Sequence, residues 1–167
     1  PKRIAYLQTR LPGTKESVLD KSRRVLDERL ERLGSEVVHE LRCAHEQDAV
    51  QNAMREALAA APDMVFVAGA SAIVDRRDIV PAGIEAAGGS VEHFGMPVDP
   101  GNLLLLAWHG TTPVIGLPGC ARSPKMSGFD FVLRRLAADL PVTARDIMRM
   151  GAFGLLKDCL LYTSPSP

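Results

Sequence analysis

The sequence has no excess of charge of either sign and few aromatic residues. Its 167 residues hold 20 Lys and Arg against 20 Asp and Glu, and 5% are aromatic. A chain without net charge lacks the basic surface that binds nucleic acids and anionic membranes, and so few aromatic residues do not make a base-stacking surface. No apolar run reaches the length of a membrane helix, and no secretory signal is visible. We therefore expect a cytoplasmic protein without a nucleic-acid or membrane partner.

Cysteine and histidine are also scarce. Cys43, Cys120 and Cys159 are odd in number and widely spaced, which indicates neither a disulfide framework nor a metal-binding motif. The four histidines form no zinc-type motif, and we interpret them as surface or packing residues. The length suits one domain that can bury a core without such cross-links.

The two ends of the chain differ from the rest of it. The chain starts at Pro1 directly before an expected strand, whereas residues 159–167 change composition abruptly and show no hydrophobic period. We expect the domain to cover residues 1–158, as a fragment of a longer protein. We interpret residues 159–167 as a non-native tail and exclude them from the fold.

In the first half of the chain, short apolar runs alternate with amphipathic segments. Strands are expected at Arg3–Thr9, Glu36–Leu41 and Met64–Ala68, and helices from Ser17 to about Leu33 and over Ala44–Ala61. Ser17 and Asp20 have the spacing of a variant capping box at the start of the first helix. This alternation predicts an α/β fold with a mostly parallel sheet.

The second half of the chain predicts a different kind of strand pairing. A helix is expected around Pro81, a strand at Ser90–Phe94, and a long last helix over Ser127–Leu140. Leu103–Trp108 and Pro113–Leu117 are apolar runs joined by a turn, which indicates a possible antiparallel hairpin at the edge of the sheet.

Small or charged residues fill three loops that follow expected strands, Leu11–Lys21, Gly69–Asp78 and Pro118–Pro124. Loops after parallel strands emerge at the same end of a sheet, so these loops can converge on one pocket. Basic side chains and backbone N–H groups suit a phosphate, and carboxylates suit a metal or a hydroxyl group. The chemistry-bearing residues in or beside these loops are Lys15, Asp20, Lys21, Ser71, Asp75, Arg76, Arg77, Asp78, Arg122, Ser123 and Lys125.

Simpler interpretations stay open for single residues in these loops. Asp20 can stabilise a helix through its dipole, and Asp78 can cap the helix that contains Pro81. Cys120 suits a small packing residue, since no histidine lies near it in sequence. Ser71 lacks the Gly-x-Ser-x-Gly motif of a serine hydrolase, and neither a dinucleotide fingerprint nor a P-loop is present.

Four segments, in order, are similar to motifs of one known family. Asp20-Lys21-Ser22 resembles an Asp-Ser-Asn segment that opens the first helix, and Ala68-Gly-Ala-Ser71 with Arg77-Asp78-Ile-Val-Pro81 resembles a Gly-Gly loop followed by Arg-Asp and Pro. Pro100-Gly-Asn-Leu-Leu104 resembles Pro-Gly-Lys-Pro-Leu, and Gly116-Leu-Pro-Gly-Cys-Ala121 resembles Gly-Leu-Pro-Gly-Asn-Pro. Over Arg3–Leu156 the chain therefore resembles the molybdopterin-binding domain shared by molybdopterin adenylyltransferases and molybdopterin molybdenumtransferases. It is most similar to bacterial molybdopterin-binding proteins that are sometimes fused to a cytidylyltransferase-like domain.

The resemblance implies a three-layer α/β/α sandwich that binds the pterin and its phosphate. It also implies a part in molybdenum cofactor biosynthesis, by metal insertion or by nucleotidyl transfer from ATP or CTP, in a homo-oligomer or a fused protein. By the resemblance, Asp20 and Asp78 are catalytic and hold Mg²⁺ or molybdate. The cofactor-binding residues that it implies are Gly69, Ala70, Ser71, Asp75, Pro118, Gly119, Arg122, Ser123 and Lys125.

The chain departs from the family pattern within these motifs. Ala70 replaces a glycine, Lys21-Ser22 stands where the family has an asparagine, and Cys120-Ala121 replaces Asn-Pro. Two functions therefore stay open, an enzyme of cofactor assembly and a module that binds the cofactor without catalysis. The family also includes relatives that cleave pyridine nucleotides or ADP-ribose, and a related hydrolase is a further alternative.

Overall fold

The fold is built on a six-stranded mixed sheet, and the computed structural model describes residues 1–153. The strand order is β2-β1-β3-β6-β5-β4. The strands are β1 (Arg3–Arg10), β2 (Glu36–Ala44), β3 (Met64–Ala68), β4 (Ser90–Phe94), β5 (Leu105–His109) and β6 (Thr112–Gly116). β2, β1, β3 and β6 run parallel, while β5 is antiparallel to both of its neighbours. The mostly parallel sheet and the β5–β6 hairpin are therefore confirmed.

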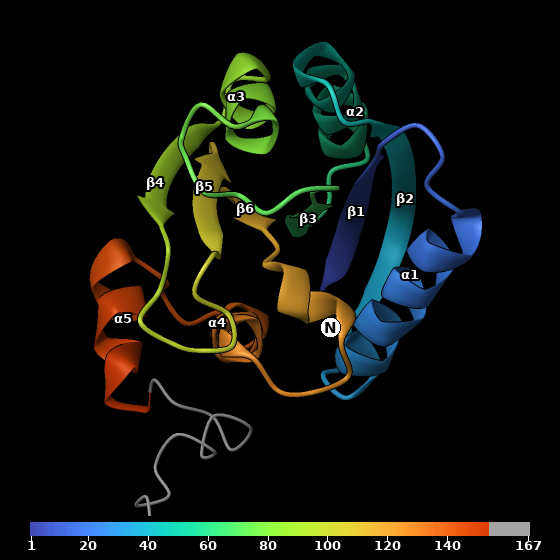
Figure 1. Cartoon of the computed structure of the whole chain (residues 1–167). Coiled ribbons are helices and arrows are strands. Elements are labelled where there is room, and N and C mark those ends of the chain that lie inside the picture. Colours follow the sequence, from blue (N-terminus) through green and yellow to red (C-terminus); the bar gives the residue numbers. More distant parts are fainter. Residues whose placement is uncertain (154–167) are drawn as a thin grey trace, which may run out of the picture.

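Helices cover both faces of the sheet (Figure 1). They are α1 (Glu16–Glu31), α2 (Gln47–Ala59), α3 (Ile79–Ala86), α4 (Gly128–Ala137) and α5 (Ala144–Arg149), with short 3-10 helices η1 (Gly119–Arg122) and η2 (Met150–Phe153). α2 and α3 lie on one face, and α1 and α4 lie on the other. This arrangement is the expected three-layer α/β/α sandwich. Within the described residues, no helix has the length and apolar composition needed to cross a membrane.

Alternate residues of each central strand enter the two cores. On β1, Ile4 and Tyr6 pack in the core under α1 and α4, whereas Ala5 and Leu7 pack in the core under α2 and α3. β3 is buried at all of its positions, as expected for a strand covered on both faces. These buried strands hold their carboxyl ends at fixed positions, where the loops begin.

The limits of several elements differ from those expected. Ser17 lies inside α1 and does not begin it, because Lys15 is the N-cap residue and no side chain caps that helix end. The expected Ser17–Asp20 capping box is therefore wrong, and the Asp20 carboxylate pairs instead with Arg42 on β2. The last expected helix, Ser127–Leu140, corresponds to α4, which starts after a capping box of Ser127 with Asp130 and ends at Ala137; the further helix α5 was not expected. The expected domain limit at residue 158 and the tail at 159–167 lie outside the described residues.

Candidate functional site

A pocket lies at the carboxyl ends of β1, β3 and β6. The chain leaves β1 for β2 on one side of the sheet and returns past β1 to β3 on the other, so the strand order reverses between β1 and β3. Open α/β sheets bind ligands at this kind of reversal, outside the carboxyl ends of the strands. The pocket is lined by Ser22 and Leu26 of α1, by residues 68–72 at the end of β3 and in the loop after it, and by Leu117, Pro118, Gly119, Ala121 and Arg122 after β6. We call it the loop pocket.

The loop pocket brings together six of the eleven residues expected at the site. Those residues are Gly69, Ala70, Ser71, Pro118, Gly119 and Arg122. Arg122 joins the two loops directly, because its Nη2 donates a hydrogen bond of 2.7 Å to the carbonyl oxygen of Gly69. The loops that follow β3 and β6 therefore meet at one end of the sheet, as expected from the sequence.

The lining of the loop pocket is rich in hydrogen-bond donors. In the part of the chain that the structure describes, the backbone N–H groups of Ser71 and Ala72 have no acceptor. The guanidinium of Arg122 carries five N–H donors, one of which is used on Gly69. Ala70, by contrast, donates its N–H to Thr9 at 2.7 Å and is not available to a ligand. A cation beside unpaired N–H groups favours an anion.

Tyr6 adds a hydroxyl group to the loop pocket. The side chain lies on β1, is 2% exposed and lines the pocket. Its hydroxyl has no hydrogen-bond partner within residues 1–153. Burial raises the pKa of Tyr6, and the opposing charge of Arg122 does not cancel that effect, so the hydroxyl stays protonated at neutral pH. A protonated hydroxyl near a guanidinium is a second donor for an anion.

A chain of hydrogen bonds crosses the ends of three neighbouring strands beside the loop pocket. Thr9 at the end of β1 contacts Nδ1 of His45 at 2.8 Å, and Nε2 of His45 contacts Ser71 at 2.9 Å. His45 directly follows β2, and Ser71 lies in the loop after β3. Burial lowers the pKa of His45, with Asp78 acting in the opposite direction, so the imidazole is neutral at neutral pH.

Arg29 fixes the loop after β6 from the side of α1. The side chain is 8% exposed, and its Nε donates to Asp130 at 2.9 Å. Its Nη1 and Nη2 donate to the carbonyl oxygens of Ala121, Ser123 and Lys125 at 2.8, 2.6 and 2.9 Å. Ser123 and Lys125 are expected ligand residues, but the structure places their carbonyls against Arg29, and neither residue lines the loop pocket.

Asp75 and Asp78 shape the loop after β3. Asp78 holds the N-cap position of α3, but its Oδ2 accepts hydrogen bonds from the N–H groups of Val74 and Asp75 at 2.7 and 2.9 Å. These two bonds lower the pKa of Asp78. Asp75 in turn accepts the N–H of Arg77 at 2.8 Å. Asp78 thus closes its own loop and does not cap α3 with its side chain, and neither carboxylate lines the loop pocket.

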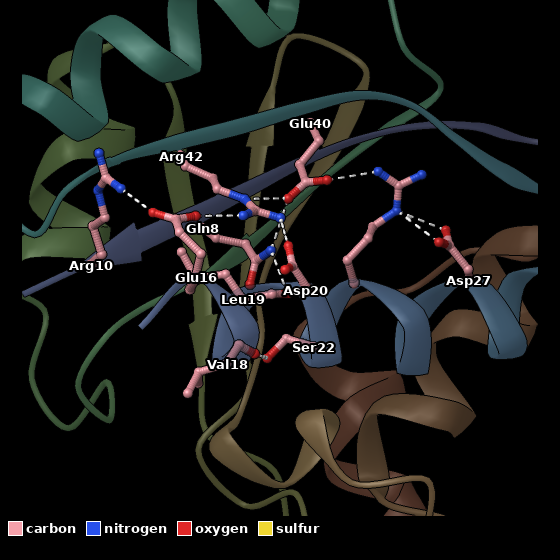
Figure 2. Close-up of polar contacts among 11 residues, drawn as sticks. Gln8, Arg10, Glu16, Val18, Leu19, Asp20, Ser22, Asp27, Glu40 and Arg42 are labelled. Carbon is pink, nitrogen blue, oxygen red and sulfur yellow. Dashed lines mark hydrogen bonds and ion pairs between the residues drawn. The ribbon is translucent and has the colours of Figure 1, made fainter. Parts of the chain in front are cut away.

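Asp20 belongs to a network of ion pairs between α1 and β2 (Figure 2). Its Oδ1 accepts from Nη2 of Arg42 at 2.8 Å, while Arg42 also pairs with Glu40 and Glu16 at 2.7 and 2.6 Å. Burial alone would raise the pKa of Glu40, but hydrogen bonds from Arg42, Arg23 and Gln8 outweigh it and lower that pKa. Asp20 therefore faces β2 and not the loop pocket.

No metal site is formed by the described residues alone. Groups of three or more His, Cys, Asp or Glu side chains that could hold a metal ion do not occur between residues 1 and 153. Cys120 does not have the character of a nucleophile, because burial raises the pKa of its thiol. Catalysis and metal binding by Asp20 and Asp78 stay predictions.

Sequence reasoning did not find three residues of this region. The sequence pattern places His45 within a helix, but β2 continues to Ala44 and carries His45 to the carboxyl edge of the sheet. Tyr6 has the pattern of an ordinary core residue, and Arg29 that of a solvated helix residue. Because the expected strand ends at Leu41, nothing in the sequence indicates that His45 lies at the end of a strand, where site residues gather in parallel sheets.

These observations define an α/β domain with a pocket lined by hydrogen-bond donors at the reversal of its strand order. Residues 7–138 match the model of the family described as "Probable molybdopterin binding domain", and the chain belongs to this family. A comparison with curated protein sequences found no significant match.

Several solved structures share the fold. The protein CinA with unknown function from Thermoplasma acidophilum has a TM-score of 0.59 and 16% identity, over 83% of this chain and 97% of that one. The molybdopterin biosynthesis enzyme MoaB from Thermus thermophilus has a TM-score of 0.55 and 16% identity, over 84% and 99%. A molybdopterin biosynthesis moea protein from Pyrococcus horikosii has a TM-score of 0.52 and 18% identity, over 87% of this chain. The match spans 35% of the length of the Pyrococcus protein.

Proposed function

We propose that this domain binds molybdopterin and takes part in molybdenum cofactor biosynthesis, with the terminal phosphate of the pterin held in the loop pocket. The observation that carries this proposal is the set of donors around one cavity. The cavity is lined by Arg122, Tyr6, Ser71 and Ala72. Within residues 1–153, the Tyr6 hydroxyl, the backbone N–H groups of Ser71 and Ala72 and some N–H groups of Arg122 have no acceptor. A phosphate has enough oxygen atoms to accept from all of them.

The pterin ring system lies outside this cavity in our proposal, along the two loops. Val74 and Met126 belong to the loops after β3 and β6, and both are large apolar side chains with about half or more of their surface exposed, 64% and 47%. Exposed apolar surface beside a polar cavity is typical of sites for ligands with an anionic group and a flat ring. In this proposal the bound phosphate fixes the position of the pterin, and the exposed surface of the two loops covers the pterin ring system.

The chemical step, if the domain catalyses one, is a transfer to the pterin: a nucleotidyl group from ATP or CTP with release of pyrophosphate, or molybdenum from molybdate, whose displaced oxide leaves as water with the two thiol protons. Asp20 and Asp78 are the proposed catalytic carboxylates. As the residues stand, they do not fit a metal site, because Asp20 is paired with Arg42 and Asp78 is bonded to two N–H groups. We therefore assign no step to a metal ion.

The test separates catalysis from binding. The chain is incubated with molybdopterin, ATP or CTP, Mg²⁺ and molybdate, and the pterin products are separated and identified. A nucleotidylated or molybdenum-loaded pterin identifies a transferase, whereas binding without a product identifies a cofactor-binding module. Asp78→Asn and Asp20→Asn should abolish product without abolishing binding if these carboxylates are catalytic. Absence of both binding and product contradicts the proposal.

A further inference from the structure

Thr9 and His45 are two polar residues beside the loop pocket to which the proposed function gives no part. Thr9 is 1% exposed, and its Oγ1 has two neighbours. It accepts the N–H of Ala70 at 2.7 Å and contacts Nδ1 of His45 at 2.8 Å. In such a buried place, each hydroxyl needs partners for both its oxygen and its proton.

This requirement decides which nitrogen of His45 carries the proton. The oxygen of Thr9 accepts the N–H of Ala70 and keeps a second lone pair, but within residues 1–153 the one acceptor in contact with the Thr9 hydroxyl is Nδ1 of His45. If Nδ1 carried a proton, the proton of Thr9 would be buried without an acceptor, which costs free energy. Thr9 therefore donates to Nδ1, and the neutral imidazole carries its proton on Nε2.

The proton on Nε2 decides in turn what Ser71 can do. Nε2 donates to Oγ of Ser71 over 2.9 Å, so the oxygen of Ser71 is the acceptor in this contact. The proton of the Ser71 hydroxyl is then free to be donated to a ligand. In this state Nε2 has no lone pair to take a proton from Ser71, so the serine is not activated as a nucleophile.

We propose that Thr9 and His45 are positioning residues that hold residues 69–71 ready for an anion and fix the Ser71 hydroxyl as a donor to that anion. Thr9 holds the backbone at Ala70, and His45 holds the side chain of Ser71. Gly69 shows how little room the arrangement leaves, because a Cβ there would lie 2.9 Å from the carbonyl oxygen of Ser71 and 3.1 Å from Cγ2 of Val80. The identification of the anion as the pterin phosphate rests on the proposed function.

The first measurement needs no ligand. The ¹⁵N NMR shifts of the His45 imidazole at neutral pH distinguish the two neutral tautomers. We expect the tautomer with the proton on Nε2, and we expect Thr9→Val to weaken this preference. A proton on Nδ1 would overturn the proposal, since Ser71 would then donate to His45. That result would point to a base-activated serine, which labelling by a fluorophosphonate would detect.

The second measurement uses inorganic phosphate as the probe. His45→Phe and Ser71→Ala should each weaken phosphate binding by about tenfold, because each removes or disorders one donor to a charged group. His45→Gln keeps an N–H that can reach Ser71 and should restore most of the affinity. Circular dichroism and melting curves identify any variant that fails to fold. Equal phosphate affinity in folded wild-type, His45→Phe and His45→Gln proteins would overturn the proposal.

The same variants separate this inference from the proposed function. If phosphate binding follows the expected pattern but molybdopterin does not bind, the positioning role stands and the pterin assignment fails. If molybdopterin binds equally well to wild-type and His45→Phe proteins, the pterin assignment stands and the positioning role fails.

Discussion

Replacing Arg29 by methionine tests how the loop after β6 is held against α1. The variant keeps a long side chain that favours helix but leaves the Asp130 carboxylate and the loop carbonyls without their donor. Removing one partner of a buried ion pair costs about 3–5 kcal/mol. For a chain of 167 residues each kcal/mol lowers the melting temperature by about 2–4 °C, so we expect a fall of roughly 6–20 °C.

Urea unfolding, followed by the fluorescence of Trp108 and by circular dichroism, measures this loss. Arg29→Lys keeps a charge for Asp130 but cannot reach several carbonyls at once, so it should lose about half as much stability. Arg24→Met is the matched control, since Arg24 is exposed on the same helix and should change stability by less than about 0.5 kcal/mol. A loss below about 1 kcal/mol in Arg29→Met would refute the reasoning.

Four further predictions concern single residues. Tyr6→Phe should fold normally and bind phosphate roughly tenfold more weakly in a calorimetric titration, since only one donor is removed; unchanged affinity would exclude Tyr6 from the site. Gly83→Ala should destabilise the domain by about 1–3 kcal/mol in urea, because the new Cβ would lie 2.4 Å from Val50. The folded state lowers the pKa of His45, so the unfolded chain binds its proton first and stability falls as the pH drops through about 6.5. Between pH 7 and pH 5, the melting temperature should fall less for His45→Gln than for wild type. Burial raises the pKa of Cys43 to about 11, so its alkylation by iodoacetamide at pH 8 should be much slower than that of a model thiol. Equal rates of alkylation would show that burial does not raise the pKa of this thiol.

The α/β architecture could be predicted because strong local patterns agree with the tertiary structure. Met64–Ala68 and Ser90–Phe94 are strands with the expected limits, since each run is bounded by turn-forming residues. β2 was expected to end at Leu41, but it continues to Ala44 because pairing with β1 compensates for the polar side chain of Arg42. Helix α5 was not expected, although Thr143 and Asp146 form a capping box that marks its start.

The site could be predicted in its loops but not in its contacts. Gly69, Ser71 and Arg122 were expected from loop position and family resemblance, and all three line one pocket. The partners of Asp20 and Asp78 could not be read from the sequence, because Arg42 lies on another element and the N–H groups around Asp78 depend on the fold of its loop. Sequence patterns place elements, whereas side-chain partners across elements follow only from tertiary packing.

The most direct test of the central claim is whether the loop pocket holds a pterin. Wild-type protein, Arg122→Gln and the exposed control Arg24→Gln are purified from a host that makes molybdopterin, and their oxidised extracts are assayed for fluorescent pterin. Arg122 is the cation that lines the pocket and joins its two loops, so Arg122→Gln should carry at least about tenfold less pterin than wild type and the control. Equal pterin in all three proteins, or none in wild type even after molybdopterin is added, would contradict the assignment of this pocket.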